Sequence, residues 1–275
     1  MATTILVLFV TLWAVIFVHE FGHLEAMREC GIPVKKMLVG IGPSIHIKNE
    51  WLQKKFGKDF EFSFGLFPLA GAVMAKESED AEHGSYGNVT YIAGAGPLIN
   101  ILTCTFTLGL LSLMRLVSGH SPHFSVTLFG SDLHLSSWGL PALLIAVTLL
   151  GWGFRRFVCG YIFPALALVL IVQISFAFAV HWHEIWQGGN IASLANDAAK
   201  VQDGLGLVRF WIYLNFILGL SNLIPLYPLD GGHIVGRLLE TFFRGGAKVL
   251  RYAGMTAFAF LMVFCISSDL WILFK

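Results

Sequence analysis

The stretch VIFVHEFGHLEAM (15–27) decides how this chain is interpreted, because it places histidines and glutamates inside an apolar segment. Ionisable side chains are costly in a bilayer and mark functional sites when they occur there. His19 and His23 lie four residues apart, on one face of a helix, so both imidazoles can reach one Zn²⁺. Glu20, beside them, can take a proton from a water that the metal activates. The alternative is a histidine pair hydrogen-bonded to neighbouring helices.

A third ligand is available in SNLIPLYPLDGGH (221–233). Catalytic zinc takes three protein ligands and leaves a fourth position for water. Pro225 and Pro228 interrupt a helix, and the two glycines after Asp230 free the backbone. Asp230 can therefore protrude towards the centre of a helix bundle. An ordinary turn aspartate is the alternative, and His233 is a rival ligand.

The composition is that of a membrane protein. Of 275 residues, 56% are hydrophobic and only 13% charged, whereas soluble domains carry about a quarter charged residues. The net charge of +1 gives no electrostatic case for nucleic-acid binding. Because about 20 apolar residues cross a bilayer, we predict an all-α polytopic membrane protein with about six transmembrane helices. The predicted spans are about 4–27, 88–115, 138–154, 158–181, 206–228 and 249–273.

Lysine and arginine predict the orientation of these spans. Fourteen of the 18 basic residues fall in the connections after the first, third and fifth spans. Basic residues favour cytoplasmic loops, so both termini are expected outside and the histidines and Asp230 in the cytoplasmic half of the membrane. That common depth favours one shared site. No basic residue precedes Arg28, so we expect the first run to be a retained span and not a cleaved signal peptide.

The two motifs together resemble the site-2 protease family of intramembrane zinc metalloproteases. GIGP (40–43) with FSFGLFPLAGAV (62–73) resembles the family's glycine-rich stretch and its membrane-re-entrant β-hairpin, expected here at about 60–75. AGAGPLINIL (93–102) resembles the start of the next core helix. The outer connections of about 20 residues are too short for a folded domain, so the PDZ modules of many bacterial relatives are not expected.

The resemblance implies one zinc ion per chain, with His19, His23 and Asp230 as ligands and Glu20 as the catalytic acid and base. It also aligns Asn222 with an asparagine that holds the substrate backbone or the oxyanion. A carboxamide donor can stabilise such a developing charge. The alternative for this residue is a hydrogen bond that packs one helix against another.

The expected hairpin contains the candidate substrate-binding residues Phe64, Gly65, Pro68 and Gly71. Non-helical backbone is tolerated at membrane depth only where protein or water covers it. A strand edge there could pair with an unwound segment of substrate, as sheet edges do with peptides. A plain interfacial hairpin without substrate contact is the alternative.

These expectations amount to a zinc-dependent endopeptidase of a bacterial inner membrane that cleaves transmembrane segments of single-span proteins. A zinc transporter or chaperone is one rival, although the second and third predicted spans carry no Asp, Glu or His. A catalytically silent homologue is another, against which the intact Glu20 argues. HWHE (181–184) is not expected to form a second metal site, because residues two apart do not share a helix face.

Overall fold

The computed structural model describes residues 2–76, 86–119, 124–128, 131–135, 138–171, 173 and 204–273. The described chain is mostly helical and carries two small antiparallel sheets. Three of its helices are long and apolar enough to cross a membrane. They are α1 (Ala2–Glu29), α3 (Tyr86–Val117) and α8 (Gly204–Ser221). This supports an integral membrane protein.

The region after α3 is bent. A two-stranded sheet of β3 (Phe124–Leu128) and β4 (Ser131–Leu135) precedes α4 (Gly139–Gly153). A helical segment, Arg155–Ile171, then follows at 76° to α4 and opens with α5 (Arg155–Phe157) and the π-helical η2 (Val158–Ile162). Among the described residues the candidate spans number three, or four if this bent pair counts as one, so the six predicted helices are not confirmed. The end of the predicted span 158–181 and the HWHE stretch lie outside the described residues.

The chain breaks after α8, where the prolines and glycines predicted it. The predicted span 206–228 is too long at its C-terminal end, because α8 ends at Ser221. Residues 222–229 form a turn that includes a cis Tyr227–Pro228 peptide. A helix that we did not predict, α9 (Asp230–Phe242), starts at the aspartate, and α10 (Gly246–Leu273) follows.

The first sheet pairs β1 (Val34–Ile47) with β2 (Glu61–Ala75), and α2 (Glu50–Phe56) connects them. The predicted hairpin bounds of about 60–75 are corrected, because that stretch is a single strand whose partner lies earlier in the chain. Val39 pairs both with Gly71 and with Phe64, so the first half of β1 lies between the two ends of β2.

Glycines in the GIGP stretch permit this arrangement. Gly40 and Gly42 both have φ of +86°, a conformation that side chains other than glycine rarely adopt. A Cβ on Gly65 would lie 2.6 Å from the Gly40 carbonyl oxygen, so the strands meet backbone to backbone here.

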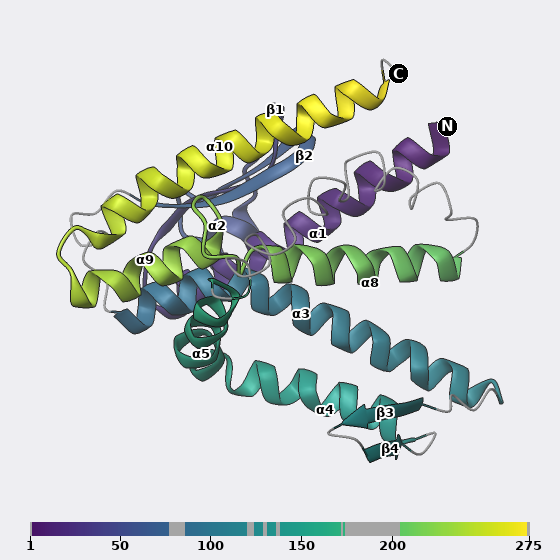
Figure 1. Cartoon of the computed structure of the whole chain (residues 1–275). Coiled ribbons are helices and arrows are strands. Elements are labelled where there is room, and N and C mark those ends of the chain that lie inside the picture. Colours follow the sequence, from purple (N-terminus) through teal and green to yellow (C-terminus); the bar gives the residue numbers. More distant parts are fainter. Residues whose placement is uncertain are drawn as a thin grey trace.

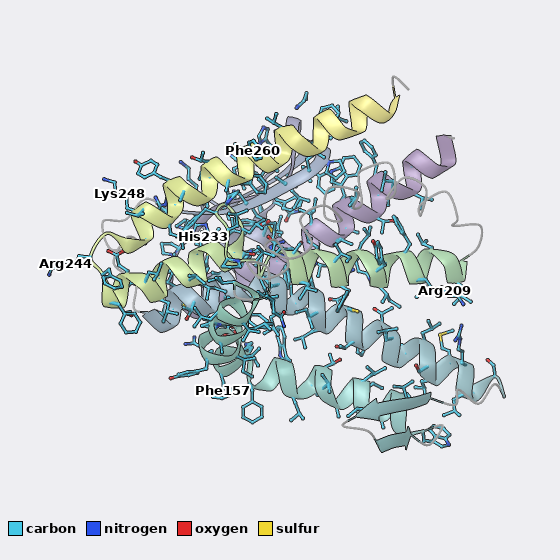
Figure 2. The ribbon with its side chains drawn as sticks, viewed as in Figure 1. Phe157, Arg209, His233, Arg244, Lys248 and Phe260 are labelled. Atoms are coloured by element: carbon cyan, nitrogen blue, oxygen red, sulfur yellow. The ribbon has the colours of Figure 1, made fainter. Side chains whose placement is uncertain are left out.

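Helix α3 is central to the helical layer, since it contacts α1, α4, α8 and α9. Figure 1 shows α1, α3, α4 and α8 diverging from the middle of the molecule, with the start of α1 and the end of α10 on the same side of the view. In Figure 2, Arg244 and Lys248 lie at the α9–α10 turn and Arg209 at the opposite end of the molecule. The HEFGH stretch of α1 falls where these helices converge.

Candidate metal centre

Three donor atoms converge at the middle of the molecule, two from α1 and one from the first residue of α9. His19 Nε2 lies 3.0 Å and His23 Nε2 3.4 Å from Asp230 Oδ2. The two imidazole Nε2 atoms are 3.2 Å apart. Ligands held at about 2.0–2.1 Å around a tetrahedral zinc are about 3.3–3.4 Å from one another. The spacing of the three atoms therefore fits one zinc ion.

The hydrogen bonds around these atoms also fit a metal. The Nδ1 of His23 donates to the Ile92 carbonyl oxygen at 2.7 Å, which leaves the Nε2 lone pair facing the cluster. Asp230 Oδ2 is buried and lies against the two imidazole Nε2 atoms. Metal-ligating histidines usually donate their other ring N–H in this way. Two imidazoles and one carboxylate form a donor set that catalytic zinc uses.

The turn before α9 aims Asp230 at the histidines. The Gly231 N–H donates to the Asn222 carbonyl oxygen at 2.6 Å, closing the turn onto the end of α8. A Cβ on Gly232 would lie 2.6 Å from the Tyr227 nitrogen, so glycine is required there by space. His233 instead packs against the Tyr227 ring, with centroids 4.6 Å apart. The structure thus brings Asp230 to the histidine pair, and not the rival His233.

Glycines from two other elements close on the motif. A Cβ on Gly71 of β2 would lie 2.5 Å from Glu20 Oε1. A Cβ on Gly96 of α3 would lie 2.8 Å from His19 Cε1 and would also collide with His23 Nε2. Glu20 is only 6% exposed. The carboxylate and both imidazoles are therefore enclosed by backbone, which glycine alone allows to come this close.

The four candidate substrate-binding residues separate in the structure. Phe64 pairs with both halves of β1, and Gly65 pairs with its second half. Both residues therefore lie inside the sheet. The Phe64 ring also packs against Trp13, at 5.1 Å between centroids. Pro68 is buried at the bend of β2. Gly71 is the one of the four that lies against Glu20.

Asn222, the other residue predicted to contact substrate, directly follows α8. Its Nδ2 donates to the Leu218 carbonyl oxygen at 3.0 Å, within its own helical turn. An amide nitrogen has two hydrogens, so this bond leaves the side chain a second donor.

Comparison with known proteins identifies the family of this chain. The model of Peptidase family M50 matches residues 7–264, nearly the whole chain. The chain belongs to peptidase family M50. The resemblance to the site-2 proteases is thus confirmed, and the chain is a metalloendopeptidase by family.

Bacterial M50 relatives match to different extents. A Campylobacter jejuni protein with a provisional zinc metalloprotease name is 25% identical, over 93% of this chain and 90% of its own length. The protease RseP of Yersinia pestis is 30% identical over 41% of this chain and 28% of its own length. The regulator of sigma-E protease RseP of Escherichia coli is 29% identical over 35% of this chain and 23% of its own length. The match to the two RseP proteins thus covers about a quarter of their length.

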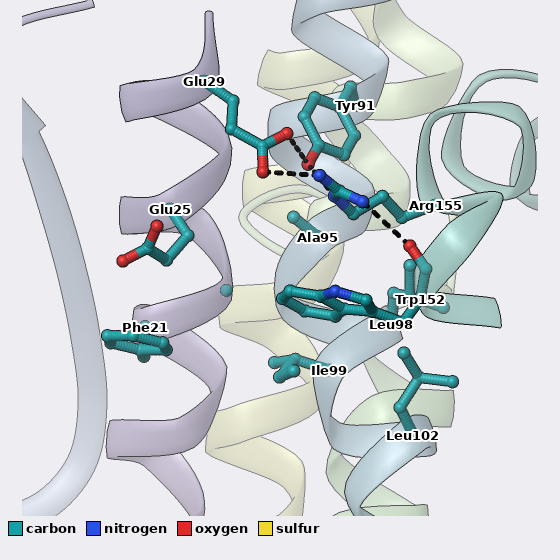
Figure 3. A pocket seen from close by; sticks show the side chains of 11 residues that line it. Phe21, Glu25, Glu29, Tyr91, Ala95, Leu98, Ile99, Leu102, Trp152 and Arg155 are labelled. Carbon is teal, nitrogen blue, oxygen red and sulfur yellow. Dashed lines mark hydrogen bonds and ion pairs between the residues drawn. The ribbon is translucent and has the colours of Figure 1, made fainter. Parts of the chain in front are cut away.

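A second polar cluster in this M50 peptidase was not predicted from the sequence. Arg155 Nη2 lies 2.8 Å from Glu29 Oε1, and its Nε donates to the Tyr91 hydroxyl at 3.1 Å. That hydroxyl donates in turn to Glu29 Oε2 at 2.8 Å (Figure 3). The cluster borders a pocket lined by Gly22, Leu98 and other residues. The ion pair between Arg155 and Glu29 joins the bend after α4 to the end of α1, beyond the HEFGH motif.

Proposed function

We propose that this chain is a zinc-dependent intramembrane endopeptidase that cleaves transmembrane segments of other membrane proteins. His19, His23 and Asp230 would hold one zinc ion per chain. The observation that carries the proposal is the convergence of their three donor atoms within 4.8 Å inside an M50 chain. The names of the bacterial RseP relatives support a role in regulated proteolysis.

Bound zinc would supply Lewis-acid activation of water and of the scissile carbonyl group. Glu20 accepts the proton of the attacking water at its carboxylate and passes it to the nitrogen of the leaving amine. Its buried position against Gly71 holds the carboxylate beside the histidine pair. Asn222 points its remaining amide hydrogen at the substrate backbone or at the developing oxyanion.

The substrate segment adds to the edge of the sheet. The second end of β2, residues 71–75, pairs with the first half of β1 on one side, and Gly71 lies against Glu20. A peptide that extends this edge would bring its backbone beside the catalytic carboxylate. A helical substrate must unwind first, because helical peptide groups are already hydrogen-bonded to one another. In this proposal Phe64, Gly65 and Pro68 shape the sheet, and Gly71 makes the substrate contact.

The topology that we propose has six spans, both termini outside and the metal centre in the cytoplasmic half of the membrane. The basic residues after the first, third and fifth predicted spans support it. The ion pair between Glu29 and Arg155 also supports it, because a contact between the end of α1 and the bend after α4 fits two segments on the same side of the membrane. Labelling of single cysteines introduced at Lys54 and Arg209 tests it, since these should react from opposite sides of the membrane.

The decisive experiment is cleavage of a panel of labelled single-span substrates by purified protein. Wild type should cleave at least one substrate, and Glu20→Gln should cleave none while it keeps its zinc. Glu25→Gln is the matched control, because Glu25 lies on the same helix but pairs with Lys55, away from the cluster. Cleavage by Glu20→Gln at the wild-type rate, or by neither protein across the panel at full zinc content, would reject the proposal.

A further inference from the structure

An asparagine near the metal centre is buried without any partner. Asn100 of α3 is 0% exposed. Neither its Nδ2 nor its Oδ1 has a hydrogen-bond partner among the described residues. Buried polar groups are almost always hydrogen-bonded, because their desolvation is otherwise uncompensated. A fully orphaned amide within a membrane-spanning helix therefore needs an explanation.

One of the proposed zinc ligands has the same deficit. The Nδ1 of His23 donates to Ile92, but the Nδ1 of His19 is buried and has no partner among the described residues. Metal-ligating histidines almost always donate their second ring N–H to a carboxylate, a carbonyl oxygen or a water. None of the described residues therefore accepts a hydrogen bond from the second ring nitrogen of His19.

The packing puts these two orphaned groups on successive turns of facing helices. Helices α1 and α3 run antiparallel here. His23 contacts Ile92, and His19, one turn earlier in α1, contacts Gly96, one turn later in α3. Asn100 lies four residues beyond Gly96, one turn further on the same face of α3. Helix α8 closes the other side, since a Cβ on Gly219 would lie 3.2 Å from Asn100 Cβ. The amide is therefore held beside α8, one turn of α3 beyond the contact between Gly96 and His19.

We propose that Asn100 is the positioning residue of His19 and acts through one buried water. The water accepts the Nδ1–H of His19 and is held by the Asn100 amide, which satisfies both orphaned groups at once. This keeps the proton on Nδ1 and directs Nε2 at the metal, as Ile92 does for His23. The inference rests on the proposed zinc site and adds a residue to its support.

Zinc affinity of the purified, stripped protein tests this, measured by titration against a competing chelator. Asn100→Leu should raise the zinc Kd by about 10–100-fold, the usual effect of losing such a partner. Asn100→Asp should bind zinc at least as tightly as wild type, because a carboxylate oxygen still accepts from the water or from Nδ1. Asn215→Leu is the matched control: Asn215 of α8 is also 0% exposed, but its Nδ2 already donates to the Trp211 carbonyl oxygen at 2.9 Å. It should leave the zinc Kd unchanged.

A second readout separates positioning from general loss of stability. In the cobalt-substituted protein, Asn100→Leu should change the visible absorption bands of the metal, and Asn215→Leu should not. If Asn100→Leu does not fold, Asn100→Asp decides alone: weaker zinc binding than in wild type overturns the inference, and binding that is equal or tighter supports it.

Unchanged zinc affinity and cobalt spectrum in folded Asn100→Leu would overturn the inference and leave the proposed function intact. Wild type that binds no zinc would instead defeat the proposed function itself.

Discussion

Replacing Gly96 with alanine tests how the histidine pair is seated. The new Cβ would lie 2.7 Å from His23 Cε1 and 2.8 Å from His19 Cε1, whereas ordinary contact begins at 3.4 Å. The His19 ring must therefore retreat by about 0.6 Å and the His23 ring, whose Nε2 is closer still, by more than that, or α1 must separate from α3. Zinc ligand distances tolerate only about 0.2 Å. Overpacking of this kind costs about 1–3 kcal/mol, which as lost zinc affinity is about 5- to 150-fold.

The assay is a zinc titration of the stripped protein against a competing chelator, together with thermal unfolding of the zinc-free form. Gly87→Ala is the control, because it makes the same substitution in the same helix where a Cβ meets nothing within 4 Å. It should leave zinc affinity unchanged and add up to about 1 kcal/mol of helix stability. Gly96→Ala should lose zinc affinity.

One result would refute this reasoning. If Gly96→Ala binds zinc as tightly as wild type and unfolds no earlier than the control, the close approach of α3 does not seat the histidines. The rings would then be held by α1 and the metal alone.

Three further predictions concern the surroundings of the centre. Gly71→Ala should keep its zinc but lower kcat by about 10–100-fold, because its Cβ displaces Glu20 Oε1; an unchanged kcat at full zinc content contradicts this. Arg155→Met should lower the free energy of unfolding by about 1–3 kcal/mol, since Glu29 loses its ion pair, and equal denaturation midpoints would count against it. The hydrogen bond from His46 and the nearby lysines lower the pKa of Glu61 from 4.5 to about 2. That carboxylate stabilises the fold above pH 4.5, and its contribution is lost as the pH falls towards 2. The melting temperature of wild type should therefore drop further than that of Glu61→Gln over this interval, and parallel curves would refute the assignment.

The sequence predicted the parts of the site that depend on local spacing. Two histidines four residues apart share a helix face wherever that helix lies, so His19 and His23 could be paired without a fold. The break before Asp230 followed from Pro225 and Pro228, which cannot continue a regular helix. That Asp230, and not His233, reaches the pair depended on the turn between α8 and α9, which only the structure supplies.

The sequence did not predict which residues far apart in the chain contact one another. The hairpin bounds were misplaced because β2 pairs with β1, 14 residues long and earlier in the chain, and alternation within β2 does not identify that partner. Gly71 and Gly96 were visible as glycines, but nothing local distinguishes a glycine that faces a ligand from one that faces lipid. The Arg155–Glu29 cluster joins residues from separate helices, and each charge alone resembles an ordinary interfacial residue.

Zinc bound by the three proposed ligands would be a structural link as well as a catalyst. Helix α9 packs on α3 and α10, so its direct link to α1 at the centre runs through Asp230 and the two histidines. A metal that binds only the folded form stabilises it by mass action, by about 4 kcal/mol at a free concentration 1,000 times its Kd. Zinc bound at this junction would therefore hold α9 against α1. Its removal should loosen α9 and α10 before the α1–α3 interface, because that interface has its own close backbone contact at Gly22.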